Sequence, residues 1–401
     1  MARILFLAHR IPYPPNKGDK IRSWHFLEHL LQKHDVHLGF YVDSKADLQY
    51  VDFLRQRSTS ICFTYVSKFM LKLRAMMGLV WNEPLSFAAY PKSKLRRYVK
   101  GLLEREEIDL IFLFSGAVGP LIGRERPDFP VIADLVDVDS AKWEAYSKQS
   151  VFPLSWLYAR EAKVLAEAEA VIARQASITT FVSADEARLF KQRIVGGGYG
   201  KIMHLNNGVD VDHFNPERFT GVDPAPNSVI FTGAMDYLPN IEAAEWFVEN
   251  VWPIVRSRIP EACFKIAGGP TPKRVKQLAQ TGGVDVTGYV DDMAEAIAAA
   301  SVVVAPLRTA RGIQNKVLEG MAMAKPVIAT AAAKEGIEAQ IGKHVLVAEE
   351  PKEFADLLIS LMADAGKASA IGEAARMHIL KHYKWQHSLS EFDGFISELV
   401  K

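Results

Sequence analysis

Residues 305–322 combine charged and small residues at a spacing that suits the binding of an anion. Lys316 and Glu319 are three positions apart, so they share one face if this stretch is helical. The loop before them consists of Gly312, Ile313, Gln314 and Asn315. Backbone amides at the start of a helix attract an anion. The segment therefore predicts a diphosphate site, with Lys316 at the phosphates and Glu319 at a sugar diol.

Simpler explanations exist for both side chains. Lys316 would otherwise be a surface lysine whose aliphatic stem lies along the helix, and Glu319 would be a solvated helix residue. The neighbours of Glu319 are apolar, which favours a partner for its charge: Val317, Leu318, Met321 and Ala322. Arg308, in the loop before the helix, is a further cation that could reach the phosphates.

A second set of candidate residues lies in the first half of the chain. Gly18 is predicted in a loop between the first strand and a helix from about Asp19, where a glycine lets backbone approach a diphosphate. A simple turn glycine is the alternative. Asp134, Asp137 and Asp139 follow another strand and are expected to point toward a cleft on alternate steps. Sugar or acceptor hydroxyls are their first expected role, helix capping the second and metal binding the third. The histidines lack ligand spacing, so no metal site is predicted.

The elements that must position these residues alternate between strands and helices. Apolar runs predict strands at 4–8, 36–42, 61–66, 110–114, 131–135, 178–182 and 201–205, and again at 229–232, 263–267, 284–287, 302–305, 327–330 and 344–347. Helical periodicity predicts helices at 19–33, 45–57, 93–105, 154–175 and 184–191. In the second half, one helix is predicted between Pro239 and Pro260, with an apolar stripe from Ile241 to Val255. Such alternation is typical of parallel sheets covered by helices.

Turn residues near Asn207 divide the chain into two such sets. We predict a domain at 1–207, a second at 208–384, and a C-terminal helix within 385–401 that packs back on the first domain. The expected fold class is α/β, with two Rossmann-like doubly wound domains facing a central cleft. Ligands of such sheets bind beyond the carboxyl ends of the strands.

Composition limits the possible functions. The formal net charge is +1, so no overall field attracts nucleic acid, and no nucleic-acid partner is predicted. Cys62 and Cys263 lie in separate apolar runs, which favours a reducing compartment. The apolar start of the chain is interrupted at His9, as in a first strand rather than a signal peptide. No run is long enough to span a bilayer, so a cytoplasmic protein is expected.

Several motifs resemble those of family 4 glycosyltransferases, which have the GT-B fold. Asn207-Gly208-Val209-Asp210 resembles the family's domain junction, and residues 315–330 resemble its Glu-Ala-Met-Ala-x-Gly-x-Pro-Val signature. The turn at 288–293 is similar to the family's base-binding turn, which makes Tyr289 and Val290 predicted substrate-binding residues. Gly233, after the first strand of the second domain, is another. Residues 9–20 and 134–143 resemble the narrower group of sugar transferases found with bacterial exopolysaccharide and PEP-CTERM systems.

The resemblance implies transfer of a sugar from a UDP- or GDP-sugar to a glycan or polyprenyl-linked acceptor. It also implies retention of the anomeric configuration and no need for a metal or other cofactor. Glu319 matches the second Glu of the family's Glu-x7-Glu pattern, which binds the ribose, whereas Arg311 replaces the first, which contacts the transferred sugar. The family's Arg…Lys phosphate pair is missing too, and Lys316, Arg308 and Arg311 are the candidates to replace its charge.

Catalysis is assigned to Arg311, Asp137 and Asp139. Arg311 would be a fixed cation that stabilises the departing diphosphate, although a loop arginine is often simply solvated. Two alternative functions remain. A GT-B protein that binds a nucleotide sugar without catalysis is favoured by the loss of the first Glu. A GT-B epimerase would share the fold but is expected to lack the Asn-Gly-Val-Asp junction.

The spacing of residues 67–81 predicts a helix with one apolar face and with Lys68 and Lys72 on another face. Its apolar face contains Phe69, Met70, Leu73, Met76, Met77, Val80 and Trp81. Such a helix could rest on an anionic membrane surface, here the inner face of the cytoplasmic membrane. A core or dimer helix is the more common explanation. Residues 152–157 could join the same surface.

Overall fold

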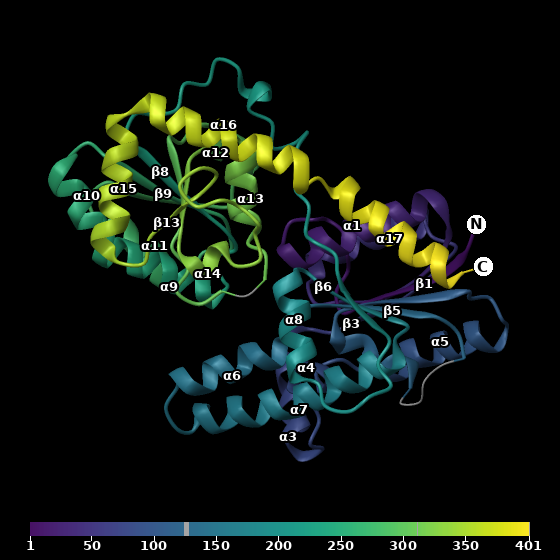
Figure 1. The fold of residues 1–401 in the computed structure, drawn as a ribbon. Helices are drawn as coiled ribbons and strands as arrows, with labels where there is room; N and C mark the ends of the chain where they lie inside the picture. Colours follow the sequence, from purple (N-terminus) through teal and green to yellow (C-terminus); the bar gives the residue numbers. More distant parts are fainter. Residues whose placement is uncertain (124–127, 311, 401) are drawn as a thin grey trace. The chain divides into compact units, whose positions relative to one another are not determined.

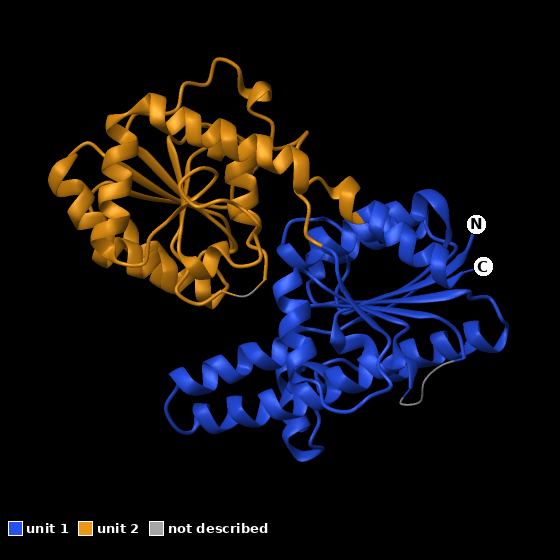
Figure 2. Cartoon of the chain, in the orientation of Figure 1, with its two compact units in different colours: residues 1–205, 389–401 blue, residues 206–388 orange. Residues whose placement is uncertain are grey.

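The computed structural model describes residues 1–123, 128–310 and 312–400. The chain forms two compact units, of which unit 1 contains Met1–Leu205 with Leu389–Lys401, and unit 2 contains Asn206–Ser388 (Figure 2). Each unit is built around its own parallel sheet with helices on both faces (Figure 1). The two predicted doubly wound α/β domains are therefore confirmed.

The sheet of unit 1 has the strand order β3-β2-β1-β4-β5-β6-β7, and all of its pairings are parallel. Its strands are β1 (Arg3–Ala8), β2 (Asp35–Val42), β3 (Ser60–Tyr65), β4 (Leu110–Phe114), β5 (Val131–Val136), β6 (Ile178–Phe181) and β7 (Lys201–His204). Central strands of a parallel sheet are covered on both faces, which explains why the predicted strands are continuous apolar runs. The strand order reverses between β1 and β4.

Two hydrophobic cores lie on opposite faces of this sheet. Leu5 and Leu7 of β1 belong to one core, and Ile4 and Phe6 belong to the other. The helices that cover them are α1 (Gly18–Lys33), α2 (Val51–Arg55), α3 (Lys68–Val80), α4 (Leu85–Ala88), α5 (Ser93–Glu104), α6 (Asp139–Gln149), α7 (Leu154–Gln175) and α8 (Ala184–Arg193), with short 3-10 turns at Lys45–Tyr50 and Gly116–Ile122. The last helix, α17 (Trp385–Leu399), crosses the boundary between the units. Its Phe392 ring lies 4.9 Å from the Phe26 ring, inside unit 1.

The sheet of unit 2 has the order β10-β9-β8-β11-β12-β13, again parallel throughout. Its strands are β8 (Ser228–Thr232), β9 (Cys263–Ala267), β10 (Val284–Gly288), β11 (Val302–Ala305), β12 (Val327–Ala329) and β13 (Leu346–Val347). Its helices are α9 (Leu238–Trp246), α10 (Trp252–Arg258), α11 (Lys273–Gln277), α12 (Met293–Ala298), α13 (Asn315–Ala322), α14 (Ala331–Lys334), α15 (Pro351–Ala363) and α16 (Ala365–His382), with 3-10 turns at Pro216–Phe219 and Leu278–Gln280. This order reverses between β8 and β11.

The helix predicted between Pro239 and Pro260 is confirmed, since the chain is helical without a break from Leu238 to Arg258. It contains a π-helical turn at Phe247–Val251 that was not predicted, where the Trp252 N–H donates to the Phe247 carbonyl five residues earlier. Pro253 explains this turn, because it has no N–H to continue the α-helical pattern and its ring would clash with a carbonyl of the preceding turn. The apolar stripe was the correct observation, since Val248, Val251 and Val255 are all buried.

Among the helices of the described residues, none has both the length and the apolar character that crossing a bilayer requires.

Candidate functional site

The reversal of strand order in unit 2 brings two helices together at the carboxyl edge of its sheet. The chain leaves β8 toward α9 and leaves β11 toward α13, and ligands of doubly wound sheets bind where such connections diverge. Lys316 of α13 and Asn240 of α9 meet at this point. The Lys316 Nζ donates to the Asn240 Oδ1 at 3.0 Å, and the Asn240 Nδ2 donates to the Ala234 carbonyl at 2.9 Å.

Lys316 is a buried cation beside a neutral amide. Its residue is only 9% exposed, and its Nζ lies 5.6 Å from the centre of the Phe231 ring. Burial lowers the pKa of Lys316 to about 8, an effect partly offset by the carboxylate of Glu319. Burial likewise raises the pKa of Glu319 to about 7, partly offset by Lys316. Both side chains therefore carry charge at a cost in desolvation, and an anionic ligand beside Lys316 would offset the cost of the lysine.

Two glycines let the backbone pass close to this pair. Gly233, just after β8, has φ of 155°, and a Cβ atom there would lie 2.8 Å from the Asn240 Nδ2 and 3.4 Å from the Lys316 Cε. Gly268, just after β9, has φ of 122°, and its Cβ would lie 2.0 Å from the Gly233 carbonyl oxygen. A side chain at either position would push into the site, so this edge requires glycine.

The amino terminus of α13 adds backbone donors to the site. Gly312 reaches φ of 65° just before the helix, and the side chain of Gln314 at the N-cap position makes no capping hydrogen bond. The Gln314 Nε2 instead donates to the Gly312 carbonyl at 3.3 Å, and the Asn315 Oδ1 accepts from the Asn207 Nδ2 at 3.2 Å. An uncapped helix start next to a buried lysine is suited to an anion. Ile313 is buried in the same turn.

The remaining predicted residues of unit 2 lie in different surroundings. Arg308 is exposed, donates to the Glu349 carbonyl at 3.0 Å and places its guanidinium 5.1 Å from the Trp246 ring centre, so its described contacts do not include Lys316. Arg311 lies outside the described residues, and its assignment stays a prediction. Tyr289 is largely exposed just after β10, with Val290 half-buried beside it. An exposed ring at the carboxyl edge of the sheet is available to stack on a planar base.

Asp134 of unit 1 does not face a ligand, contrary to its expected position. It lies within β5, is fully buried, and forms a two-pronged ion pair with Arg22 of α1, at 2.7 Å to the Nε and 3.0 Å to an Nη nitrogen. The Thr180 hydroxyl donates to the same carboxylate at 2.9 Å. Asp134 lies inside the strand and not after it, since β5 continues to Val136. Asp134 is therefore a structural residue.

Asp137 and Asp139 lie beyond the end of β5, where the backbone turns at Val136 with φ of 69°. The Asp137 Oδ1 is buried without a hydrogen-bond partner in the described structure, and burial, then the nearby carboxylates of Glu186 and Asp139, raise the pKa of Asp137 to about 7. Asp139 is exposed at the start of α6. An unpartnered buried carboxyl oxygen at a strand end is suited to a hydroxyl ligand.

Helix capping by these aspartates, the second expected role, is taken over by glutamates from other helices. The Glu186 Oε2 accepts from the Val138 N–H at 2.6 Å, and the Glu169 Oε1 accepts from the Ser140 N–H at 3.0 Å. Both amides belong to the start of α6. For the third role, no group of three or more His, Cys, Asp or Glu residues within 1–123, 128–310 and 312–400 is arranged to hold a metal ion.

Gly18 was predicted to lie in a loop, but it is the first residue of α1. The next residue, Asp19, is paired with Arg10, and the Arg10 Nε also contacts the Asp43 Oδ2 at 3.0 Å. The His9 Nε2 lies 3.4 Å from the Asp19 Oδ2. Burial opposes the ionisation of Asp19, but His9 and Arg10 outweigh it and lower the pKa of that carboxyl. Charges at this end of α1 are thus mostly neutralised by one another.

The residue that sequence reasoning overlooked is Asn240. It appears in the sequence only as part of Pro239-Asn240, the start of a helix. Pro239 does occupy the first turn of α9, so the helix start was read correctly. Asn240 is 4% exposed, however, and a buried amide in the first turn of a helix usually has a specific partner. The sequence shows neither this burial nor the partner Lys316, so it offered no signal for Asn240.

Residues 226–364, which contain all of this lysine site, match the glycosyl transferases group 1 family. Unit 2 contains a glycosyl transferases group 1 domain. A GDP-mannose-dependent monoacylated alpha-(1-6)-phosphatidylinositol monomannoside mannosyltransferase of Corynebacterium glutamicum is 27% identical over 236 residues, which are 54% of this chain and 60% of that protein. A GDP-mannose-dependent alpha-(1-6)-phosphatidylinositol monomannoside mannosyltransferase of Mycobacterium tuberculosis is 26% identical over 243 residues, or 55% and 61%. The match thus spans about 60% of the length of these relatives.

Solved structures resemble the whole chain. Anabaena HepE, in complex with UDP and glucose, matches with a TM-score of 0.68 and 17% identity, covering 100% of both chains. Sucrose-phosphate synthase from Thermosynechococcus elongatus matches with a TM-score of 0.75 and 16% identity, covering 100% of this chain and 99% of that one. With the group 1 domain and the two parallel sheets, these likenesses confirm the predicted GT-B fold.

Proposed function

We propose that this protein is a glycosyltransferase that moves a sugar from a nucleotide-sugar donor to a glycan or lipid-linked acceptor. The observation that carries the proposal is the Lys316–Glu319 pair at the switch point of a group 1 domain. A buried ammonium whose described hydrogen-bond partner is the neutral Asn240 is well suited to a diphosphate. The group 1 match favours a glycosyltransferase over a GT-B epimerase, which would share the fold.

The donor binds with its diphosphate at Lys316 and the amino terminus of α13. Glu319, one turn further along the same helix face, accepts hydrogen bonds from the ribose diol. Tyr289 stacks on the base. UDP- and GDP-sugars are the proposed donors, because a relative is named for GDP-mannose and a structural neighbour was solved with UDP. The donor is a substrate, and we propose that neither a metal nor another cofactor is needed.

The proposed reaction is a front-side displacement that retains the anomeric configuration. The acceptor oxygen forms a bond to the anomeric carbon while the bond from that carbon to the diphosphate oxygen breaks. The nucleoside diphosphate leaves with the electron pair and takes the proton of the acceptor hydroxyl. Lys316 stabilises the charge that develops on the departing diphosphate, and Arg311 is proposed to do the same. Asp137 and Asp139 are proposed to bind acceptor hydroxyls.

The acceptor is proposed to be a polyprenyl-linked or surface glycan in bacterial exopolysaccharide synthesis. The named relatives act on phosphatidylinositol mannosides, which are lipid-linked sugars too. A cytoplasmic site of action agrees with the free thiols of Cys62 and Cys263. A lipid-linked acceptor would bring the enzyme to a membrane surface, and residues 67–81 are the segment proposed to touch it.

The test is to incubate the purified protein with radiolabelled UDP- and GDP-sugars and polyprenyl-linked acceptors, with and without EDTA. Product formation that survives EDTA and is lost in Glu319→Gln supports the proposal. Tight donor binding without product in any acceptor panel would instead favour the nucleotide-sugar-binding protein without catalysis. Conversion of the free nucleotide sugar to its epimer would favour the epimerase. A product with inverted linkage would overturn the front-side mechanism while leaving the transferase activity in place.

A further inference from the structure

Helix α3 of unit 1 is apolar on two faces, but unit 1 covers only one of them. On the covered face, Leu71 and Ala75 are partly buried against the core and Gly78 is buried. A Cβ at Gly78 would lie 2.9 Å from the Glu83 carbonyl oxygen, so the close contact of this face with the following turn requires glycine. Residues 71, 75 and 78 follow helical spacing and form the inner face.

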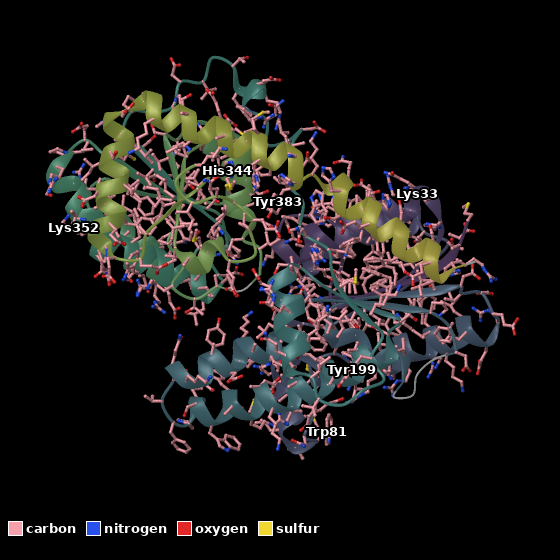
Figure 3. All side chains as sticks on the ribbon, viewed as in Figure 1. Lys33, Trp81, Tyr199, His344, Lys352 and Tyr383 are labelled. Atoms are coloured by element: carbon pink, nitrogen blue, oxygen red, sulfur yellow. The ribbon has the colours of Figure 1, made fainter. Side chains whose placement is uncertain are left out.

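The opposite face of α3 carries large apolar side chains that lie in solvent. Phe69 is 73% exposed, Met76 65% and Val80 82%. Met70, Leu73, Met77 and Trp81 are exposed as well. Trp81 lies at the end of this helix, at the outer edge of unit 1 (Figure 3). Isolated exposed apolar residues are ordinary, but a continuous row along one helix face marks a contact surface.

The loop between α6 and α7 extends this surface. Phe152 is 80% exposed, Trp156 is 60% exposed, and Val151 and Leu154 are exposed beside them. Arg160, one helical turn after Trp156, donates to the Gly78 carbonyl at 2.8 Å and to the Glu83 carbonyl at 3.1 Å. These bonds fasten the start of α7 to the end of α3. The two exposed segments, 69–81 and 151–156, therefore form one apolar surface, which we call the α3–α7 surface.

The charges on the α3–α7 surface are all positive. Lys68 and Lys72 are exposed on α3, which contains no acidic residue, and no acidic residue occurs in 67–82 at all. The first one, Glu83, is already paired with Lys92. In the segment 151–157 no charged residue occurs. A partner of this surface must therefore supply apolar contacts and negative charge together.

We propose that the α3–α7 surface docks unit 1 on a bilayer that contains anionic lipids. The aromatic and methionine side chains would enter the boundary between head groups and acyl chains, while Lys68 and Lys72 would contact lipid phosphates. A second copy of the chain is a poorer occupant, because a twofold interface places the same lysines on both sides without an acidic partner. The proposal rests on the proposed function for its lipid-linked acceptor and adds the second segment and the lipid charge. Docking itself needs neither donor nor acceptor, so vesicle binding and sugar transfer can fail separately.

Co-flotation with unloaded vesicles in a sucrose density gradient tests the proposal on the full chain. We expect the protein to bind vesicles of phosphatidylcholine with 30% phosphatidylglycerol (about one anionic lipid in three) and to bind pure phosphatidylcholine vesicles much less. Lys68→Gln/Lys72→Gln should weaken binding about fivefold for each lysine removed, and added salt should reduce this difference. Phe152→Asp/Trp156→Asp and Phe69→Asp/Met76→Asp should each abolish binding.

Matched controls come from equally exposed apolar residues elsewhere. Val195→Asp in unit 1 and Met377→Asp in unit 2 change residues that are 84% and 68% exposed, and both variants should bind vesicles as the unchanged protein does. Circular dichroism and donor binding verify that each variant is folded. The proposal would be overturned if the protein did not float with anionic vesicles, or if the Phe152 and Phe69 double variants floated as well as the unchanged protein. A dimer that these variants dissociate, without vesicle binding, would assign the surface to a second copy.

Discussion

The carboxyl edges of the two sheets have the same architecture but treat charge in opposite ways. In unit 1 the cations near the edge are matched by carboxylates: Arg10 with Asp19 and Asp43, Lys20 with Asp47, and Arg22 with Asp134. In unit 2 the buried Lys316 donates to an amide, and Glu319 is the carboxylate whose charge acts on it. The cations of the first edge are all paired with carboxylates, whereas the second edge bears the cost of a buried cation.

That difference separates structural charge from functional charge in this fold. A buried ion pair holds elements together but leaves no capacity for a ligand. A buried cation with a neutral partner destabilises the empty protein slightly and gains most when an anion arrives. Opposite effects are therefore expected at the two edges. Substituting the buried ion pair of unit 1 should change stability, whereas substituting Lys316 of unit 2 should change ligand binding.

The largest effect is expected from breaking the Arg22–Asp134 pair. Asp134→Ala leaves a guanidinium buried without its carboxylate, which should lower the free energy of unfolding by about 3–5 kcal/mol. Denaturant titration followed by circular dichroism measures the loss. Asp109→Ala is the matched control, because it removes the partner of Arg3 at the surface and should cost about 1 kcal/mol or less. Equal losses in the two variants would mean that the buried pair is not what fastens α1 to β5.

Lys316→Met should reverse this pattern. The change removes the buried charge but keeps an apolar chain next to Phe231, so unfolding should be unaffected or slightly harder. Affinity for the nucleotide sugar, measured by calorimetry, should fall about 10- to 150-fold, the equivalent of about 1.5–3 kcal/mol for hydrogen bonds to a charged group. Arg10→Met is the control from the other edge and should leave this affinity unchanged. A stability loss without an affinity loss would make Lys316 structural.

The pH dependence of binding should follow the pKa of Lys316. This pKa is lowered to about 8, so the lysine is protonated below that pH and loses its charge above it. The contribution of Lys316 to the affinity for a nucleotide sugar should therefore be constant below pH 8 and fall about tenfold per pH unit above it. The decline should be absent in Lys316→Met, which also controls for titration of the base. A decline of the same size in that variant would show that another group is responsible.

The fold could be predicted from the sequence because buried strands require apolar residues, which leave a visible pattern. Both faces of each central strand are covered, so β4 and β11 are unbroken apolar runs whose predicted bounds match the structure. The π-helical turn at Phe247–Val251 was missed because the apolar spacing around it resembles that of an ordinary helix. Only Pro253 signals the change, and its effect depends on how the turn before it adapts.

Side-chain partners were harder to foresee, because they join residues far apart in the chain. Asp134, Asp137 and Asp139 look alike in the sequence, yet the first is bound by Arg22, 112 positions away, and the second has a buried oxygen without a partner. Lys316 and Glu319 were identified because their relation is local to one helix. Asn240 was not, since its contact with Lys316 joins helices after two different strands. Local spacing can be read from a sequence, whereas a partner from another element depends on the topology.

Asn240 gives the smallest and most specific test of the comparison. Asn240→Ala removes the hydrogen bond that positions Lys316, and nucleotide-sugar affinity should fall about two- to tenfold, as for the loss of about 0.5–1.5 kcal/mol. Asn240→Asp should instead convert this edge into one like that of unit 1. Its new carboxylate would pair with Lys316, raise the pKa of the lysine and compete with the diphosphate.

In Asn240→Asp, affinity should therefore be lower at pH 7, but the decline with pH should begin well above 8. If Asn240 had only a structural role, the variant would lower affinity without changing the pH at which the decline begins. The direction of the movement is what matters, because a carboxylate beside the ammonium favours its charged form while weakening its attraction for phosphate. If the decline in affinity still begins near pH 8 in this variant, the contact between Asn240 and Lys316 does not set the charge of the site. The contrast between the two edges would then depend on burial alone.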